Sequence, residues 1–177
     1  MPTAIFPKAS RCIGEGSAFA QDRASTSWRN VLLLLLLLLL LLALLGVGAL
    51  GGGGVLIGSP SGWLMGMPLS MLAGSPFRDF LVPGILLFGV LGLAPCLLIP
   101  ALLKKPGSRF AEPLNLLRDL HWAWTGSIYV GFSLIIWIQL EMVFLHAVSW
   151  LHTVYMLLAL LILAVALLPQ VRRLYQK

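Results

Sequence analysis

The longest apolar stretch of the chain begins with an unbroken run of leucine from Leu32 to Leu42 and continues to about Ile57. Roughly 20 consecutive apolar residues in a helix cross the ~30 Å hydrocarbon core of a bilayer. A helix that is apolar on every face has no place on the surface of a small soluble protein. The pattern therefore predicts a membrane protein whose first transmembrane helix covers about residues 30–57.

Three further apolar stretches follow, and segments rich in polar residues, glycine or proline separate them. The four predicted spans are about residues 30–57, 81–103, 122–145 and 148–168. Only a very short turn separates the last two spans, which predicts an antiparallel helical hairpin. The predicted fold class is all-α, an integral membrane bundle of four transmembrane helices.

The segments outside the spans differ in character. Residues 1–29 are rich in Ser, Ala, Gly and charge and lack periodicity, so we expect a flexible basic tail. Residues 58–80 form a loop rich in Pro, Gly, Ser and Met, which we expect to lie against the membrane or over the helices. The chain then divides into a tail, 1–29, and one four-helix membrane domain, 30–177. The minor alternative is that the first apolar run belongs to a cleaved signal peptide. Both the run and the tail before it are long for such a peptide.

Charge adds an orientation to this picture. The net charge is +6, and the basic residues lie outside the spans in three clusters. The clusters are Lys8, Arg11, Arg23 and Arg29; Lys104, Lys105, Arg109 and Arg118; and Arg172, Arg173 and Lys177. Cytoplasmic segments of membrane proteins carry an excess of Lys and Arg. We therefore predict that both termini and the middle loop are cytoplasmic and that the 58–80 loop faces outward, with an anionic-lipid or partner role for the basic residues as the alternative.

Composition excludes several other classes. The chain has 177 residues, of which 59% are hydrophobic and 10% charged, against about 25% charged in a typical soluble domain. No segment is polar enough and long enough for a separate soluble domain, and the charge is not a signal for nucleic acid. Cys12 and Cys96 are predicted on different sides or depths of the membrane, so neither a disulfide nor a metal site is expected.

Small residues and prolines within the spans predict their packing. Gly46, Gly48 and residues 51–54 allow the first span to approach a neighbour closely, and they also weaken its helix. Pro95 and Pro100 predict kinks in the second span, which shape either a curved packing surface or a cavity.

Glu141 is the only acidic residue within a predicted span. A charged group there costs several kcal/mol unless it is paired, protonated or near the interface. Trp137 lies four residues earlier and shares its helix face. The predicted topology brings further polar residues to the same outer end, giving a candidate cluster of Arg78, Asp79, Glu141, His146 and His152. Two hypotheses remain open: a ligand site capped by the 58–80 loop, or a structural salt bridge between Arg78 and Glu141.

The histidines raise the question of a bound cofactor. Neutral imidazole can bind haem iron. Of the three histidines, His146 and His152 are better candidates for a haem or chlorophyll ligand than the third. However, no two histidines lie in mid-span on facing helices. No cofactor or metal is therefore predicted. The sequence also contains no recognisable catalytic motif, so the protein is not expected to be an enzyme.

Two segments carry a resemblance. The stretch MPLSMLAGSPFRDFLVPGILLFGVLGL, residues 67–93, and the stretch LIIWIQLEM, residues 134–142, resemble an uncharacterised group of small bacterial four-span integral membrane proteins. The similarity covers about residues 45–168. It implies a multi-pass protein of the bacterial inner membrane, and it implies no activity.

Three functions follow as hypotheses. The first is a non-enzymatic accessory subunit that packs against a larger membrane complex of photosynthetic or respiratory energy conversion. The second is a membrane protein that binds a small molecule or cofactor through the outer polar cluster. The third is a small transporter. One intramembrane carboxylate provides few polar groups to line a transport path, although a homo-oligomer would bring several such carboxylates together.

Overall fold

The computed structural model describes residues 12–108, 111–145 and 149–177 and is all-α. Within the described residues, four helical segments are long and apolar enough to cross a membrane. They are Ser27–Gly58, Leu81–Lys104, Trp122–Phe144 and Trp150–Leu167. The predicted fold class is confirmed: the chain is a four-span membrane protein that lies in a lipid bilayer.

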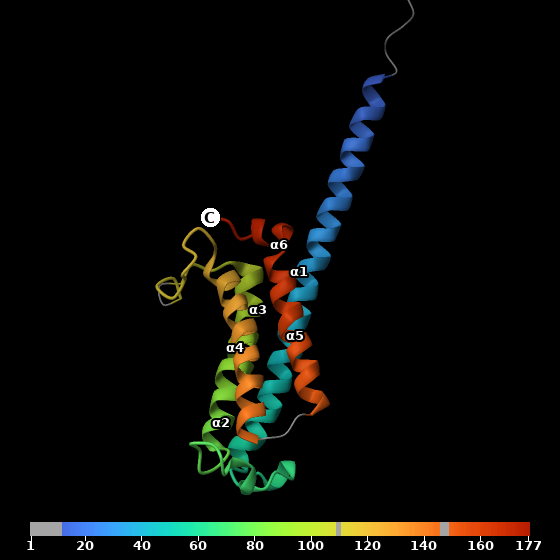
Figure 1. Cartoon of the computed structure of the whole chain (residues 1–177). Coiled ribbons are helices and arrows are strands. Elements are labelled where there is room, and N and C mark those ends of the chain that lie inside the picture. The colour runs from blue at the N-terminus through green and yellow to red at the C-terminus, as the bar shows by residue number, and fades with distance from the viewer. Residues whose placement is uncertain (1–11, 109–110, 146–148) are drawn as a thin grey trace, which may run out of the picture.

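The spans form one bundle, with the second built from three successive segments (Figure 1). In chain order the helices are α1 (Cys12–Gly58), α2 (Leu81–Leu86), the π-helix η3 (Leu87–Leu93), α3 (Ala94–Lys104), α4 (Trp122–Leu145), α5 (Trp150–Leu167) and α6 (Pro169–Arg173). Two short 3₁₀ turns, η1 (Trp63–Met65) and η2 (Leu69–Leu72), lie in the loop between α1 and α2. The α4 and α5 helices form the predicted hairpin.

The α1 helix begins earlier than the sequence pattern predicts. It continues back to Cys12, so residues 12–29, expected as part of a flexible tail, extend the helix beyond the rest of the bundle (Figure 1). No proline interrupts the chain between Cys12 and Gly58. Once the leucine run is helical, each further residue adds one hydrogen bond to an existing helix, which is far easier than nucleating a new one.

The second span is irregular just before Pro95. The Ala94 N–H donates to the Gly89 carbonyl, five residues back, and η3 is the wider π-helical turn that results. Proline lacks the N–H that an α-helix needs at its position, so the preceding turn widens instead of breaking. The predicted disturbance near Pro95 is therefore present, and it takes the form of a π-helical segment.

Glycines hold α1 and the second span in close contact, as the small residues predict. A Cβ atom added to Gly53 would lie 2.7 Å from the Phe88 backbone nitrogen and 2.9 Å from the Gly84 carbonyl oxygen. Real Cβ atoms do not approach backbone so closely, so position 53 requires glycine. The close approach replaces the hydrophobic driving force that is missing between helices in lipid.

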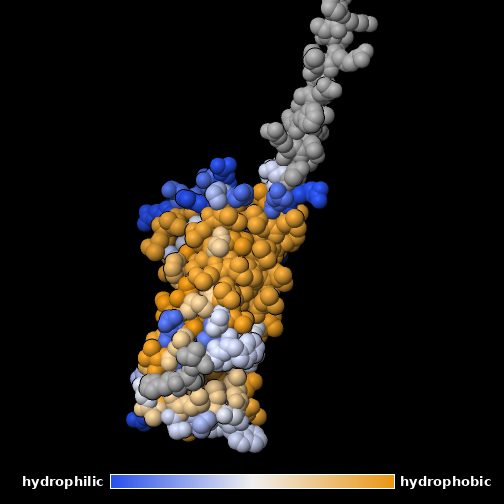
Figure 2. Space-filling model, turned by 45° about the vertical axis from the view of Figure 1, so that its right-hand side comes forward, coloured by the Kyte–Doolittle hydropathy of each residue, from blue (hydrophilic) through white to orange (hydrophobic). Residues whose placement is uncertain are grey.

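The two ends of the bundle differ in charge. The described basic residues of all three clusters lie at the end where α1 leaves the bundle and where the chain ends, and the 59–80 loop lies at the opposite end (Figures 1 and 2). On the face that Figure 2 shows, broad hydrophobic surface covers the bundle between the two ends. The described basic residues thus share one end of the bundle, and the side of the membrane that this end faces stays a prediction.

The basic end is tied together by the last residues of the chain. Tyr175 is 1% exposed, and its hydroxyl donates to the Leu102 carbonyl at 3.0 Å. The Lys105 ammonium lies 4.8 Å from the centroid of the Tyr175 ring, and the Tyr175 carbonyl accepts from the His121 N–H at 2.8 Å. Lys177 forms an ion pair with Glu112 in the middle loop. The C-terminal segment therefore closes the bundle across α3 and the start of α4.

Candidate functional site: a cavity beside Glu141

A cavity of about 390 Å³ lies between α1, η3, α4 and α5, at the end of the bundle that carries the 59–80 loop. We call it the central cavity. Its lining is Leu45, Gly48, Ala49, Gly52, Met65, Met67, Met71, Leu87, Leu91, Leu134, Trp137, Ile138, Glu141, Ser149, Leu151, His152 and Tyr155. Most of this lining is apolar, and the ionisable side chains Glu141, His152 and Tyr155 come from the facing helices α4 and α5.

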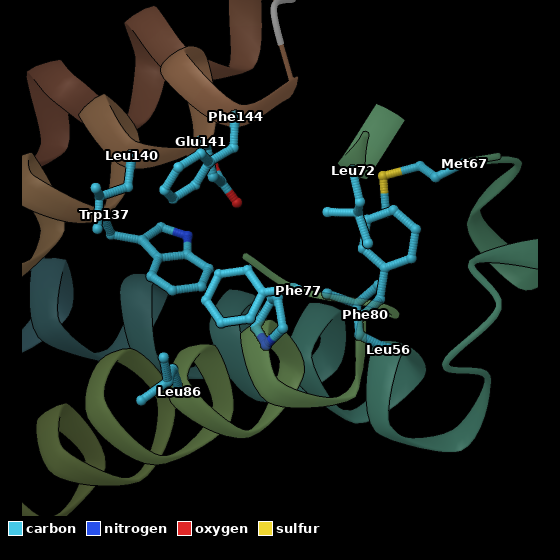
Figure 3. Close-up of a pocket in the computed structure, with 11 residues that line it drawn as sticks. Leu56, Met67, Leu72, Phe77, Phe80, Leu86, Trp137, Leu140, Glu141 and Phe144 are labelled. Carbon is cyan, nitrogen blue, oxygen red and sulfur yellow. The ribbon is translucent and has the colours of Figure 1, made fainter. Parts of the chain in front are cut away.

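A second, smaller cavity of about 100 Å³ lies between α4, the start of α2 and the loop. We call it the loop cavity. Met67, Trp137 and Glu141 line both cavities, so these three residues stand between them. Figure 3 shows the Glu141 carboxylate directed into the space between α4 and the aromatic rings of the loop. Both cavities thus meet at the only carboxylate predicted within the membrane.

Aromatic residues attach the loop to the end of α4. The rings of Phe77 and Phe144 meet edge to face with their centroids 6.1 Å apart. Phe80, which is 3% exposed, packs with Leu56 and Leu72 beneath the loop. Edge-to-face aromatic contacts contribute about 0.5–1.5 kcal/mol beyond the area they bury. The loop is therefore held against the helices by apolar contacts, as its composition predicts.

Glu141 and His152 are brought together across the α4–α5 hairpin. The Nε2 atom of His152 lies 3.7 Å from Oε2 of Glu141, and the two side chains are 13% and 31% exposed. Trp137, one turn before Glu141 on α4, lines both cavities together with the carboxylate. Glu141 therefore has ring side chains from two helices as neighbours.

The start of α5 determines the protonation pattern of His152. Ser149 caps the helix, and its backbone N–H donates to Nδ1 of His152 at 2.9 Å. A ring nitrogen that accepts a hydrogen bond carries no proton. The proton of the neutral imidazole is therefore on Nε2, which faces Glu141. A protonated ring would place a second N–H against that of Ser149 and break the capping box.

The rest of the predicted polar cluster does not join Glu141. Asp79 accepts from the Leu81 N–H at 3.1 Å through Oδ1, so it serves the turn that begins α2. Arg78 is exposed, and neither residue lines either cavity. In the described part of the chain His152, and not Arg78, lies beside Glu141, and the hypothesised salt bridge with Arg78 is not formed. His146 lies outside the described residues.

Binding of haem or chlorophyll by His152 stays a prediction, and it would require a change at the cap of α5. Its Nδ1 accepts from Ser149, and its Nε2 carries the proton that faces Glu141. A metal bound at Nε2 would require the proton on Nδ1, and this would break the capping box. The imidazole in this arrangement has no lone pair to offer to iron or magnesium.

Sequence reasoning missed several lining residues. Tyr155 follows His152 by three residues and therefore shares its helix face, a spacing that predicts the contact in retrospect. A Cβ atom added to Gly48 would lie 2.9 Å from the Tyr155 hydroxyl oxygen, so glycine on α1 makes room for the phenol. Met65, Met67 and Met71 bring the loop into the central cavity. The abundance of methionine in the loop was the available signal for these three.

Comparison of the chain with protein-family models, with curated proteins and with solved structures finds no match. The resemblance to small bacterial membrane proteins is therefore supported only in its structural part, the four long apolar helices. Any statement about function rests on the cavities and on Glu141.

Proposed function

We propose that this four-span membrane protein is a non-enzymatic binding protein for small lipophilic molecules, which it holds in the central cavity beside Glu141. The observation that carries the proposal is the position of Glu141 in the wall of both cavities. Ligand pockets are typically concave, mostly apolar and equipped with a few polar groups that orient the ligand. The central cavity, at about 390 Å³, matches this description.

The cost of Glu141 supports a functional role. An acidic side chain within a membrane span costs about 2.5–3.5 kcal/mol at mid-span, with less expected toward the interface. A neutral histidine at 3.7 Å offsets part of this cost, since it supplies one long N–H contact. A leucine at this position would fill the same space without the cost. Intramembrane ionisable residues are for this reason functional-site candidates by default.

The 59–80 loop would act as the cover of the site. It brings three methionines to the central cavity and is anchored to α4 by Phe77. We further propose that the protein lies in a bacterial inner membrane with both termini in the cytoplasm. The gathering of basic residues at the terminal end supports this orientation. The site would then open toward the outer leaflet.

The other two hypotheses stay predictions. An accessory subunit of a larger energy-converting complex would co-purify with that complex in a fixed ratio. A transporter would move its ligand in liposomes without partners, and the same cavity would serve it. A binding site is the common requirement of the second and third hypotheses.

The experiment is to fill the cavity and measure ligand binding. Gly52 lines the central cavity, and a Cβ atom added there would sit in ordinary contact, 3.6 Å from Cδ2 of Leu87. Gly51 is exposed and has no atom within 4 Å of an added Cβ. The variant Gly52→Leu therefore blocks the cavity, and Gly51→Leu is the matched control. Gly52→Ala should give a partial effect.

Binding is measured by equilibrium dialysis of phenyl-substituted probes of different charge against nanodiscs with and without the protein. We expect saturable binding of at least one probe to wild type and to Gly51→Leu, and loss of that binding in Gly52→Leu. If no probe binds above empty nanodiscs, or if Gly52→Leu binds as wild type does, the proposed function is wrong. Size-exclusion elution as in wild type shows that each variant is folded.

A further inference from the structure

We propose that the ligand of the central cavity is a lipophilic monocation whose positive charge is held by the Glu141 carboxylate. This inference rests on the proposed function and narrows it from lipophilic molecules in general to one charge type. Three features carry it: the charge balance around the cavity, the aromatic residues beside the carboxylate, and the methionines of the loop.

The charge balance favours a cation. Among the described residues that line the two cavities, Glu141 is the only one with an acidic or strongly basic side chain. Nδ1 of His152 accepts from the Ser149 N–H, and its Nε2 lies 3.7 Å from the Glu141 carboxylate, which is beyond hydrogen-bond distance. Ionised Glu141 then leaves one negative charge without a counter-charge in an apolar setting. A bound cation supplies that counter-charge, where a low dielectric strengthens the attraction.

The walls suit an organic cation better than a metal ion. The described residues contain no group of three or more His, Cys, Asp or Glu side chains placed to hold a metal. Hard inorganic cations require about six oxygen ligands, and one carboxylate among leucines does not supply them. A cation that carries its own hydrocarbon or aryl groups needs only one counter-charge and apolar contact.

Aromatic rings lie where such a cation would sit. Trp137 and Tyr155 both line the central cavity, from α4 and α5. Figure 3 shows the Trp137 indole beside the Glu141 side chain. A cation over a tryptophan or tyrosine ring is attracted by the negative face of the ring, most strongly when water is excluded. Carboxylate and rings therefore act on the same charged group.

The methionines indicate tolerance of different ligand shapes. Met65, Met67 and Met71 come from one loop and line one side of the cavity. Methionine is unbranched and polarisable, and methionine-rich surfaces occur where a protein accepts partners of varied shape. The specificity of the site would then depend on the charge and the apolar character of the ligand, and only weakly on its shape.

The test compares three phenyl-substituted probes of similar bulk in nanodiscs of neutral lipid. Tetraphenylphosphonium is the cation, tetraphenylborate the anion and triphenylphosphine oxide the neutral probe. Each is titrated by equilibrium dialysis against wild type, Glu141→Gln and Glu141→Asp, with empty nanodiscs subtracted. Glu112→Gln is the matched control, because Glu112 is exposed and paired with Lys177 in the loop between α3 and α4.

We expect wild type to prefer the cation over the neutral probe, and Glu141→Gln to weaken cation binding by about tenfold or more while changing neutral binding little. Glu141→Asp and Glu112→Gln should keep the preference. Equal affinity for cation and neutral probe, an anion preference, or equal loss of both probes in Glu141→Gln would overturn the inference and leave the proposed function standing. Failure of all three probes to bind wild type would overturn both.

Discussion

The imidazole of His152 joins two structures that are separate in the sequence. Its Nδ1 accepts from the backbone of Ser149 at 2.9 Å and completes the cap of α5, while its Nε2 lies 3.7 Å from the Glu141 carboxylate on α4. One ring therefore both takes part in the N-terminal cap of a transmembrane helix and faces the carboxylate of the cavity. This relationship makes the helix start and the proposed site dependent on the same side chain.

Replacement of His152 by alanine should destabilise the protein more than replacement of Ser149. Ser149→Ala removes the hydroxyl cap and should cost about 1 kcal/mol. His152→Ala removes the reciprocal contact to Ser149 and also the imidazole that lies 3.7 Å from the Glu141 carboxylate, which adds about 1 kcal/mol. Unfolding of both variants by SDS in mixed micelles measures the difference. Equal losses in the two variants would show that the Glu141 contact contributes nothing.

The close contact between α1 and the second span predicts opposite effects at neighbouring glycines. Gly53→Ala places a Cβ atom 2.7 Å from the Phe88 backbone nitrogen and must push the helices apart, at a cost of about 1–3 kcal/mol. Gly51→Ala meets nothing within 4 Å and should be neutral, or stabilising by up to about 1 kcal/mol through helix propensity. The same unfolding assay compares them. A Gly53→Ala protein as stable as Gly51→Ala would contradict the packing described for these helices.

The buried phenol of Tyr175 should lose its proton at a higher pH than an exposed tyrosine does. Burial raises the pKa of Tyr175 from 10.0 to about 12. Since the folded pKa lies above the unfolded one, this contribution to stability is fully present below about pH 10 and is lost as the pH rises toward 12. The phenolate absorbance of wild type minus that of Tyr175→Phe should show a midpoint near the raised value. A midpoint near the ordinary tyrosine pKa would mean that the C-terminal segment is not closed onto α3.

The orientation can be tested with two cysteine positions. In a background with Cys12→Ser and Cys96→Ser, Ser61→Cys places an exposed thiol in the loop and Gln176→Cys places one near the C-terminus. We expect a membrane-impermeant maleimide to label the Ser61→Cys protein in intact cells. The Gln176→Cys protein should be labelled only after permeabilisation. The reverse pattern would place the basic end outside.

Much of the architecture could be predicted because lipid imposes a simple requirement. The apolar run from residue 122 to 145 coincides with α4, and α5 begins within two residues of its predicted start. The start of α1 was not predicted. The residues before Arg29 continue a helix that already exists, and their sequence shows no apolar pattern that would indicate it. Hydrophobicity thus locates a span well and a helical extension poorly.

The site could be predicted only in part. Glu141 was recognisable because an acidic residue within a span is costly, and Trp137 because it lies one turn away. A salt bridge between Arg78 and Glu141 was one of two hypotheses, whereas the structure places His152 beside Glu141. Charge clusters tell which end of a bundle a residue occupies. They do not tell how far each helix is rotated about its axis, and that rotation decides which side chains meet.

Photo-crosslinking can show whether a lipophilic ligand occupies the cavity beside Glu141. An aryl-azide derivative of triphenylphosphonium is irradiated with the protein in nanodiscs, and the modified residues are identified by peptide mass spectrometry. We expect adducts on the cavity residues Met65, Met71 and Tyr155, suppressed by excess tetraphenylphosphonium. Adducts confined to the exposed outer face of α4, at Phe132 and Ile136, would show that the probe only dissolves in the surrounding lipid and would contradict the account.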